Sequence, residues 1–152
     1  MIFFYKTIAT FFGTGYSPFA PGTAGALLAA LILILFHYFQ IVLAYPFLFF
    51  LLILITSLIG IYSTNKLLYV WGKDPSKIVI DEAVGMWISM FFVPFSLLNL
   101  FLAFGLFRLF DIYKPFGIKK LEQLPGGIGV MADDILAGIY ANIVLQLIIW
   151  LL

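Results

Sequence analysis

The sequence predicts an all-α fold, a polytopic helical membrane protein with about four to five transmembrane or re-entrant helices. Of its 152 residues, 64% are hydrophobic and only 10% are charged, whereas about a quarter of the residues in an ordinary soluble domain carry charge. A spanning helix needs about 20 predominantly apolar residues, so this length leaves little room for an extramembrane domain. We therefore expect one integral membrane domain over residues 1–152, with polar loops that converge on the cytoplasmic face.

The first half of the chain predicts a helical hairpin followed by a polar loop. Two apolar runs, Ala24–Phe39 and Val42–Ser63, are separated only by a short stretch around Gln40, which is typical of two spans joined by a tight turn. The next segment, Thr64–Ile80, is polar and contains the turn signal GKDPS at Gly72–Ser76. We expect this segment to be a surface loop.

The run from Ala83 to Phe107 allows two topologies. It is apolar but is interrupted by Val93-Pro94-Phe95-Ser96, so it forms either one kinked span or two short helices joined by a turn. Cytoplasmic loops collect Lys and Arg, and only the hairpin places every basic residue of the chain on one side. We therefore predict a hairpin that turns near Pro94, a polar segment from Arg108 to Asp134, and a last span from Ile135 to Leu152. The basic residues that share one side are Lys6, Lys66, Lys73, Lys77, Arg108, Lys114, Lys119 and Lys120.

Net charge and the absence of cysteine exclude several classes of function. A net charge of +1 provides no basic field, so nucleic acid is not an expected partner. A chain without cysteine has no disulfides, thiolate metal sites or cysteine nucleophiles. The only histidine, His37, falls near the far turn, away from the charged residues, so a histidine phosphoenzyme is not expected. The sequence does not indicate an oligomeric state.

Five acidic residues lie at the ends of the apolar runs. Asp81 and Glu82 open the predicted third helix, Asp111 closes the fourth, and Asp133 and Asp134 open the last. Carboxylates beside hydrocarbon are costly unless they are paired, hydrated or coordinated, and in the hairpin topology all five gather on one face. Mg²⁺ prefers oxygen ligands and typically uses a few carboxylates together with substrate phosphate oxygens. The five carboxylates predict such a site, although acidic residues in the first turns of helices also act as caps.

Two basic residues lie next to Asp111 in the segment FRLFDIYKP. Arg108, Asp111 and Lys114 recur every three residues, so they occupy one side of a helix end that Pro115 helps to terminate. Arg can bind a phosphate with two hydrogen bonds, and Lys adds a point charge. This arrangement predicts phosphate binding, with an alternative in which Arg108 only pairs with Asp111 while Lys114 extends to the lipid headgroups.

Two glycine-rich segments precede the first and last predicted spans. They are GTGYSPFAPGTAG at Gly13–Gly25, with the hydroxyls of Thr14 and Thr23, and PGGIGVMADD at Pro125–Asp134. Glycine lets backbone amides turn toward an anion, and the following helix N-terminus adds partial positive charge, although a plain turn also explains each segment. After Asp134, small residues at 137, 138 and 141 predict a close helix contact.

Together these motifs resemble the phosphatidylglycerophosphatase A family. The similarity covers GTGYSPFAPGTAG, KIVIDEAVGMWI at Lys77–Ile88, and FRLFDIYKPFGIKKLEQLPGGIGVMADDILAGIYA at Phe107–Ala141, in the family's order. The resemblance implies a multi-pass enzyme of the bacterial inner membrane that requires Mg²⁺ and converts phosphatidylglycerophosphate to phosphatidylglycerol and phosphate. The residues that it marks as functional are Asp81, Glu82, Arg108, Asp111, Lys114, Asp133 and Asp134.

We assign a role to each candidate residue. Asp81, Glu82, Asp133 and Asp134 are the candidate catalytic residues, and either Asp133 or Asp134 is expected to act as the base, but an aspartyl-phosphate intermediate is equally compatible with the sequence. The five carboxylates, Asp111 included, are expected to bind Mg²⁺. The residues expected to bind the substrate phosphate are Arg108, Lys114, Thr14 and Thr23.

Two other functions use the same carboxylates. A lipid phosphotransferase would also combine helix-borne acids with Mg²⁺, but the spaced DG(x)nAR(x)nG(x)nD(x)nD pattern of the CDP-alcohol enzymes is absent. A nonenzymatic cation transporter would carry acids deep within several spans, whereas here the acids cluster at one end of the predicted helices. Hydrolysis of a lipid phosphate monoester therefore explains the pattern best.

Overall fold

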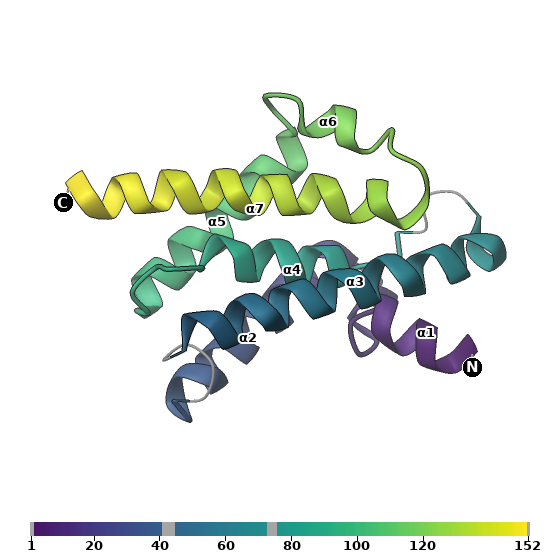
Figure 1. The fold of residues 1–152 in the computed structure, drawn as a ribbon, viewed down its shortest axis with the longest axis horizontal. Helices are drawn as coiled ribbons and strands as arrows, with labels where there is room; N and C mark the ends of the chain where they lie inside the picture. Colours follow the sequence, from purple (N-terminus) through teal and green to yellow (C-terminus); the bar gives the residue numbers. More distant parts are fainter. Residues whose placement is uncertain (1, 41–44, 73–75, 152) are drawn as a thin grey trace.

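The computed structural model describes residues 2–40, 45–72 and 76–151 of the chain. These residues are helical and include no strand, which confirms the all-α prediction. Figure 1 shows some of the helices lying along the longest axis of the molecule and others crossing it obliquely. The elements are α1 (Ile2–Ala9), the 3₁₀ turn η1 (Thr14–Tyr16), α2 (Pro21–Tyr38), α3 (Pro46–Trp71), α4 (Ile80–Ser89), α5 (Leu97–Tyr113), α6 (Ile118–Leu121) and α7 (Gly126–Leu151).

Three helices of the described residues, α2, α3 and α7, are long and apolar enough to cross a membrane. Helices α2 and α3 both begin with proline, whose fixed φ suits the first helical position. Helix α3 is longer than predicted, because residues 64–71 of the expected surface loop continue it as far as Trp71. Residues 41–44 of the predicted second span and 73–75 of the predicted turn lie outside the described residues.

The run that allowed two topologies forms two helices, α4 and α5, separated by residues 90–96. Ser96 caps α5, because its hydroxyl accepts a hydrogen bond from the Asn99 amide at 3.0 Å. Glu82 near the start of α4 forms an ion pair with Arg108 near the end of α5, so the chain reverses direction between the two helices. The predicted hairpin is therefore confirmed, and a single kinked span over this run is wrong.

Helix α7 begins at Gly126. The sequence predicted a start at Ile135, so the observed helix begins earlier than expected. Gly126 has a φ of +65°, and the next amide, that of Gly127, donates to the Asn65 side chain on α3 at 2.7 Å. This cap lets the glycine-rich segment start the helix. Asp133 and Asp134 consequently lie about two turns inside α7, and only residues 114–125 form the polar connection, which includes the short α6.

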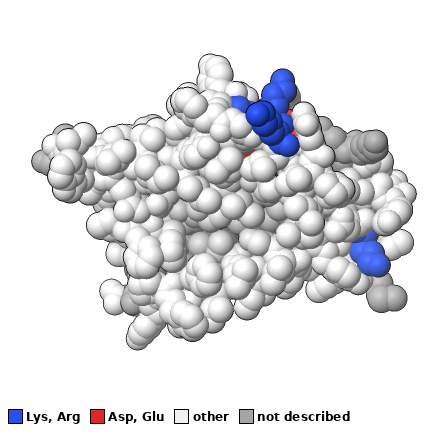
Figure 2. Space-filling model, turned by 45° about the horizontal axis from the view of Figure 1, so that its top comes forward, with Lys and Arg blue, Asp and Glu red and all other residues white. Residues whose placement is uncertain are grey.

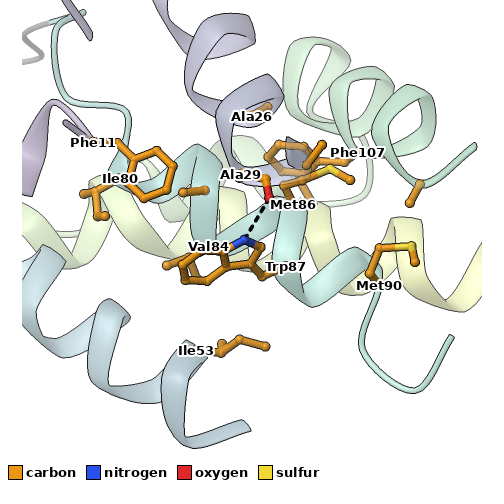
Figure 3. Close-up of a cluster of buried hydrophobic side chains, with 14 of the residues drawn as sticks. Phe11, Ala26, Ala29, Ile53, Ile80, Val84, Met86, Trp87, Met90 and Phe107 are labelled. Carbon is orange, nitrogen blue, oxygen red and sulfur yellow. Dashed lines mark hydrogen bonds between the residues drawn. The ribbon is translucent and has the colours of Figure 1, made fainter. Parts of the chain in front are cut away.

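Helix α4 occupies the centre of the fold and packs against α2, α3, α5 and α7 (Figure 1). Its Trp87 is buried and donates a hydrogen bond to the Ala29 carbonyl of α2 at 3.2 Å, the dashed line in Figure 3. On the opposite side, Gly138 of α7 lies so close to α4 that an added Cβ would be 2.5 Å from the Gly85 carbonyl oxygen. The small residues after Asp134 therefore form the close helix contact that their spacing predicted.

Candidate functional site

A cavity of about 700 Å³ opens where the start of α4, the end of α5 and the first turns of α7 meet. The first turn of α2, Leu68 of α3, the residues just before α4 and the connection before α7 also contribute to its wall. Figure 2 shows a face of the molecule that is almost entirely uncharged, with its charged side chains confined to one edge and one end. The cavity holds six of the seven acidic residues of the sequence.

All five predicted carboxylates line this one cavity. Asp81 and Glu82 come from α4, Asp111 from α5, and Asp133 and Asp134 from α7. One oxygen each of Glu82, Asp111 and Asp134 lies within 4.8 Å of the others. The helix ends therefore bring together acids that are up to 53 residues apart in the chain, as the hairpin topology predicted.

Arg108 lines the cavity and connects α5 to α4. Its Nη1 contacts the Glu82 carboxylate and lies 2.7 Å from Asp111 Oδ2. The Nε atom of the same guanidinium is buried and has no hydrogen-bond partner among the described residues. The Arg108–Asp111 pair considered as an alternative thus forms, but it belongs to a larger cluster that faces the cavity.

Lys114 turns into the cavity and not toward the lipid headgroups. It ends α5 in a left-handed conformation, with a φ of +47°, and its Nζ lies 2.5 Å from Asp133, 2.6 Å from Glu122 and 3.8 Å from Asp111. Burial alone would lower the pKa of the Lys114 ammonium, but its hydrogen bonds to Asp133 and Glu122 outweigh burial and raise the pKa above its ordinary value. Lys114 therefore remains a cation at neutral pH.

The cavity carries an excess of negative charge. Six carboxylates line it, the five predicted ones and Glu122, against two basic side chains, Arg108 and Lys114. Asp133 Oδ1 and Asp134 Oδ2 are buried and have no hydrogen-bond partner among the described residues. Buried carboxylates of this kind are costly unless a cation or a proton neutralises them. Glu82, Asp111 and Asp134 have the oxygen donors and the spacing to hold a divalent metal ion such as Mg²⁺.

Three residues of the site were not singled out from the sequence. Gly22, in the first turn of α2, lies so close to Glu82 that an added Cβ would overlap the carboxylate. Glu122 binds Lys114 from the connection before α7, and Asn65 caps α7. Gly22 belongs to the N-terminal glycine-rich segment, whose backbone amides were predicted to turn toward an anion. Nothing in the local sequence distinguishes Glu122 or Asn65 as a partner.

The structure does not bring Thr14 or Thr23 into the lining of the cavity. The Thr14 hydroxyl donates to the backbone carbonyls of Thr10 and Phe11, at 3.1 Å and 3.0 Å, and Thr23 follows the cavity-lining Gly22 by one residue. Their phosphate contacts stay predictions. His37 lines a separate pocket, where it stacks on Phe95 at a centroid distance of 4.1 Å.

Comparison with known proteins decides the family. The sequence profile described as phosphatidylglycerophosphatase A matches residues 7–149. The chain belongs to the phosphatidylglycerophosphatase A family. The resemblance inferred from the motifs is thereby confirmed, and the protein is a phosphatase of this family whose three long apolar helices make it a membrane protein.

Curated relatives cover nearly all of the chain. Phosphatidylglycerophosphatase A of Escherichia coli is 35% identical over 95% of this chain and 83% of its own length, and that of Haemophilus influenzae is 41% identical over 90% and 83%. A Bacteroides thetaiotaomicron protein named "Putative phosphatidylinositol-3-phosphatase" is 45% identical over 95% of this chain and 93% of its own length. No solved structure matches the chain.

Proposed function

We propose that this phosphatidylglycerophosphatase A family member hydrolyses phosphatidylglycerophosphate to phosphatidylglycerol and phosphate, with Mg²⁺ as cofactor. The observation that carries the proposal is the paired arrangement of Arg108 and Lys114 among carboxylates from α4, α5 and α7. Two cations bind the oxygens of a phosphate monoester, and the surrounding acids supply metal ligands and a base. The names of the relatives from E. coli and H. influenzae agree with this substrate.

Arg108 and Lys114 would bind the substrate phosphate by exchanging carboxylate contacts for phosphate contacts. Arg108 has an unpartnered Nε in addition to the Nη1 that contacts Glu82 and Asp111. Lys114 has three N–H donors and lies between Asp133 and the exposed Glu122. Both side chains stabilise the negative charge on the phosphoryl oxygens as the ester bond breaks.

The carboxylates would hold the metal ion and activate the nucleophile. Glu82, Asp111 and Asp134 form the proposed Mg²⁺ group, with Asp81 and Asp133 beside them. Bound there, Mg²⁺ supplies positive charge that neutralises the phosphate and lowers the pKa of water. Asp133 or Asp134 acts either as the base that takes a proton from the attacking water or, by the alternative route, as the nucleophile of an aspartyl-phosphate intermediate.

The location of the cavity suits a phosphorylated lipid. Its wall includes apolar side chains, among them Leu68 and Val130, beside the charged cluster. A lipid whose acyl chains stay among the helices can thus place its phosphate against Arg108 and Lys114. We propose that the site faces the cytoplasm from a bacterial inner membrane, because the basic residues lie on this side of the predicted topology.

A second candidate substrate is a lipid inositol phosphate. The Bacteroides thetaiotaomicron relative, whose printed name includes phosphatidylinositol-3-phosphatase, shares 45% of its residues with this chain, more than either relative named for phosphatidylglycerophosphate. Both lipids present a phosphate monoester at the membrane surface, so the charged cluster suits either. The two candidates differ in the headgroup that must fit the remainder of the cavity.

The test is phosphate release by purified protein in detergent micelles, with phosphatidylglycerophosphate and phosphatidylinositol 3-phosphate as parallel substrates. Each is measured with Mg²⁺, with EDTA, and with Asp134→Asn. We expect release from phosphatidylglycerophosphate that needs both the metal and the acid. Faster release from phosphatidylinositol 3-phosphate would replace the substrate assignment, and release that persists in EDTA would contradict the magnesium assignment.

A further inference from the structure

Two lysines from distant parts of the chain converge on one tryptophan outside the cavity. Lys6 of α1 places its Nζ 5.8 Å from the ring centroid of Trp71, the last residue of α3. Lys77, in the segment before α4, places its Nζ 5.9 Å from the same ring. Two ammonium groups at one indole form a local concentration of positive charge on a half-buried aromatic surface.

The backbone holds these three residues in place. The Val79 amide donates to the Ala9 carbonyl at 2.9 Å, which joins the end of α1 to the segment that carries Lys77. Gly15 of η1 packs against the Lys77 carbonyl so closely that no Cβ fits there. The Lys77 Nζ also lies 5.8 Å from the ring centroid of Tyr16. The convergence is therefore built by contacts between α1, η1 and the segment before α4.

The ammonium groups keep hydrogen-bond donors for an anion. Among the described residues, every ion pair uses Arg108 or Lys114, so no described carboxylate neutralises Lys6 or Lys77. A cation over an aromatic face directs only part of its N–H groups at the ring. The remaining donors suit an oxyanion that approaches from the solvent or headgroup side.

The surroundings indicate that this oxyanion belongs to a lipid. Tryptophan, tyrosine and lysine together are typical of the membrane–water interface, and a third lysine, Lys66, lies 5.4 Å from the ring centroid of the nearby Tyr62 on α3. The inner leaflet of a cell membrane is rich in anionic lipids that attract such lysines. The residues on either side of Lys77, Ser76 and Ile78, line the catalytic cavity, so a lipid bound here lies at its edge.

We propose that Lys6, Lys77 and Trp71 form a second lipid site, which binds the phosphodiester of an anionic phospholipid beside the cavity. The two ammonium groups hold the phosphate oxygens, and the indole packs against the glycerol and the first acyl carbons. The proposal does not depend on which phosphate monoester the cavity hydrolyses, because a diester has no terminal phosphate to remove.

The test is a lipid titration of the detergent-solubilised protein, followed by native mass spectrometry. The probe is dioleoylphosphatidylmethanol, an anionic diester with a minimal headgroup, and the reference lipid is zwitterionic dioleoylphosphatidylcholine. Each lysine near an anionic headgroup contributes about 1 kcal/mol, so two of them predict a preference of roughly 30-fold for the anionic lipid. We expect Lys6→Gln/Lys77→Gln to lose most of this preference and Lys6→Arg/Lys77→Arg to keep it.

A matched control separates a site from general charge attraction. Lys119→Gln/Lys120→Gln removes the same charge from two exposed residues of α6 and should leave the preference unchanged. Equal loss in both double glutamine variants, or an unchanged preference in Lys6→Gln/Lys77→Gln, would overturn the proposal. So would a wild-type protein that binds both lipids equally, a result that needs no variant to fold.

Discussion

Gly22 of α2 lies directly against the Glu82 carboxylate of α4, with no room between them for a methyl group. An added Cβ would also stand 3.3 Å from Nη1 of Arg108, which contacts the same carboxylate. The backbone of the first turn of α2 therefore forms one wall of the charged cluster. This wall explains why a glycine-rich segment more than 50 residues before the first acid of the cluster belongs to the site.

Gly22→Ala should displace Glu82 and reduce phosphatase activity by roughly 5- to 150-fold, because overpacking of this kind forces a shift that costs about 1–3 kcal/mol. Activity is measured as phosphate release at saturating Mg²⁺. The matched control is Gly105→Ala on α5, where an added Cβ meets no atom within 4 Å. This variant should leave the rate unchanged. A fully active Gly22→Ala enzyme would show that the position of Glu82 is not critical.

Asp134→Asn should have opposite effects on stability and on activity. Asp134 is buried beside Glu82 and Asp111, and one of its oxygens has no partner among the described residues, so removal of its charge relieves repulsion in the metal-free protein. We expect a higher melting temperature in EDTA, no further increase on addition of Mg²⁺, and a loss of activity of about 10²-fold or more. Thermal unfolding in detergent with and without Mg²⁺ measures the first two effects.

Glu122→Gln provides the comparison for that experiment, because Glu122 is an exposed acid of the same cavity that contacts Lys114 but is not in the group of three. This variant should retain the Mg²⁺-dependent increase in melting temperature. Loss of the increase in Glu122→Gln with its retention in Asp134→Asn would place the metal nearer the cavity entrance.

Lys114 should stay charged throughout the working range of the enzyme. Its pKa in the folded protein is raised above the ordinary lysine value of about 10.4. The ion pairs of Lys114 therefore contribute in full below that value, and their contribution is lost only as the pH rises through the raised pKa. In EDTA, the difference in melting temperature between wild type and Lys114→Gln should thus be constant between about pH 8 and pH 9.5. A difference that falls within this interval would contradict the raised pKa.

The placement of the acids could be predicted from the sequence because it follows from the hairpin. Once α4 and α5 are antiparallel, Glu82 and Arg108 must meet, and Asp134 joins them if α7 starts on the same side. The charge bias of the loops selected this topology. These acids share one end of the helix bundle, and the charge bias of the loops between the helices predicts such a common end from the sequence alone.

The start of α7 could not be predicted in this way. A Pro-Gly-Gly sequence normally marks a turn, but the Asn65 side chain accepts a hydrogen bond from Gly127 and lets the helix begin there. Residue 65 lies 62 positions earlier in the chain, so only the three-dimensional fold shows the pairing. The same holds for Gly22 and Glu82, whose contact depends on how α2 packs against α4.

Asn142 of α7 should stabilise the turn between α4 and α5 without taking part in the chemistry. Its side-chain amide donates to the carbonyls of Ser89 and Phe91, at 3.1 Å and 2.7 Å, which satisfies acceptors at the end of α4 that have no helical partner. Asn142→Ala should lower the free energy of unfolding by about 1–2 kcal/mol and leave the KM for the lipid substrate within about twofold.

The control is Gln146→Ala, one turn further along α7, because Gln146 is exposed and donates only to Asn142. This variant should change the unfolding free energy by less than about 0.5 kcal/mol. Chemical denaturation in detergent, with helix content followed by circular dichroism, measures both variants. Equal stability of Asn142→Ala and Gln146→Ala would contradict this role. The hydrogen bonds at the turn would then not be needed for the fold, and the close contact between Gly85 and Gly138 would be sufficient to hold α4 against α7.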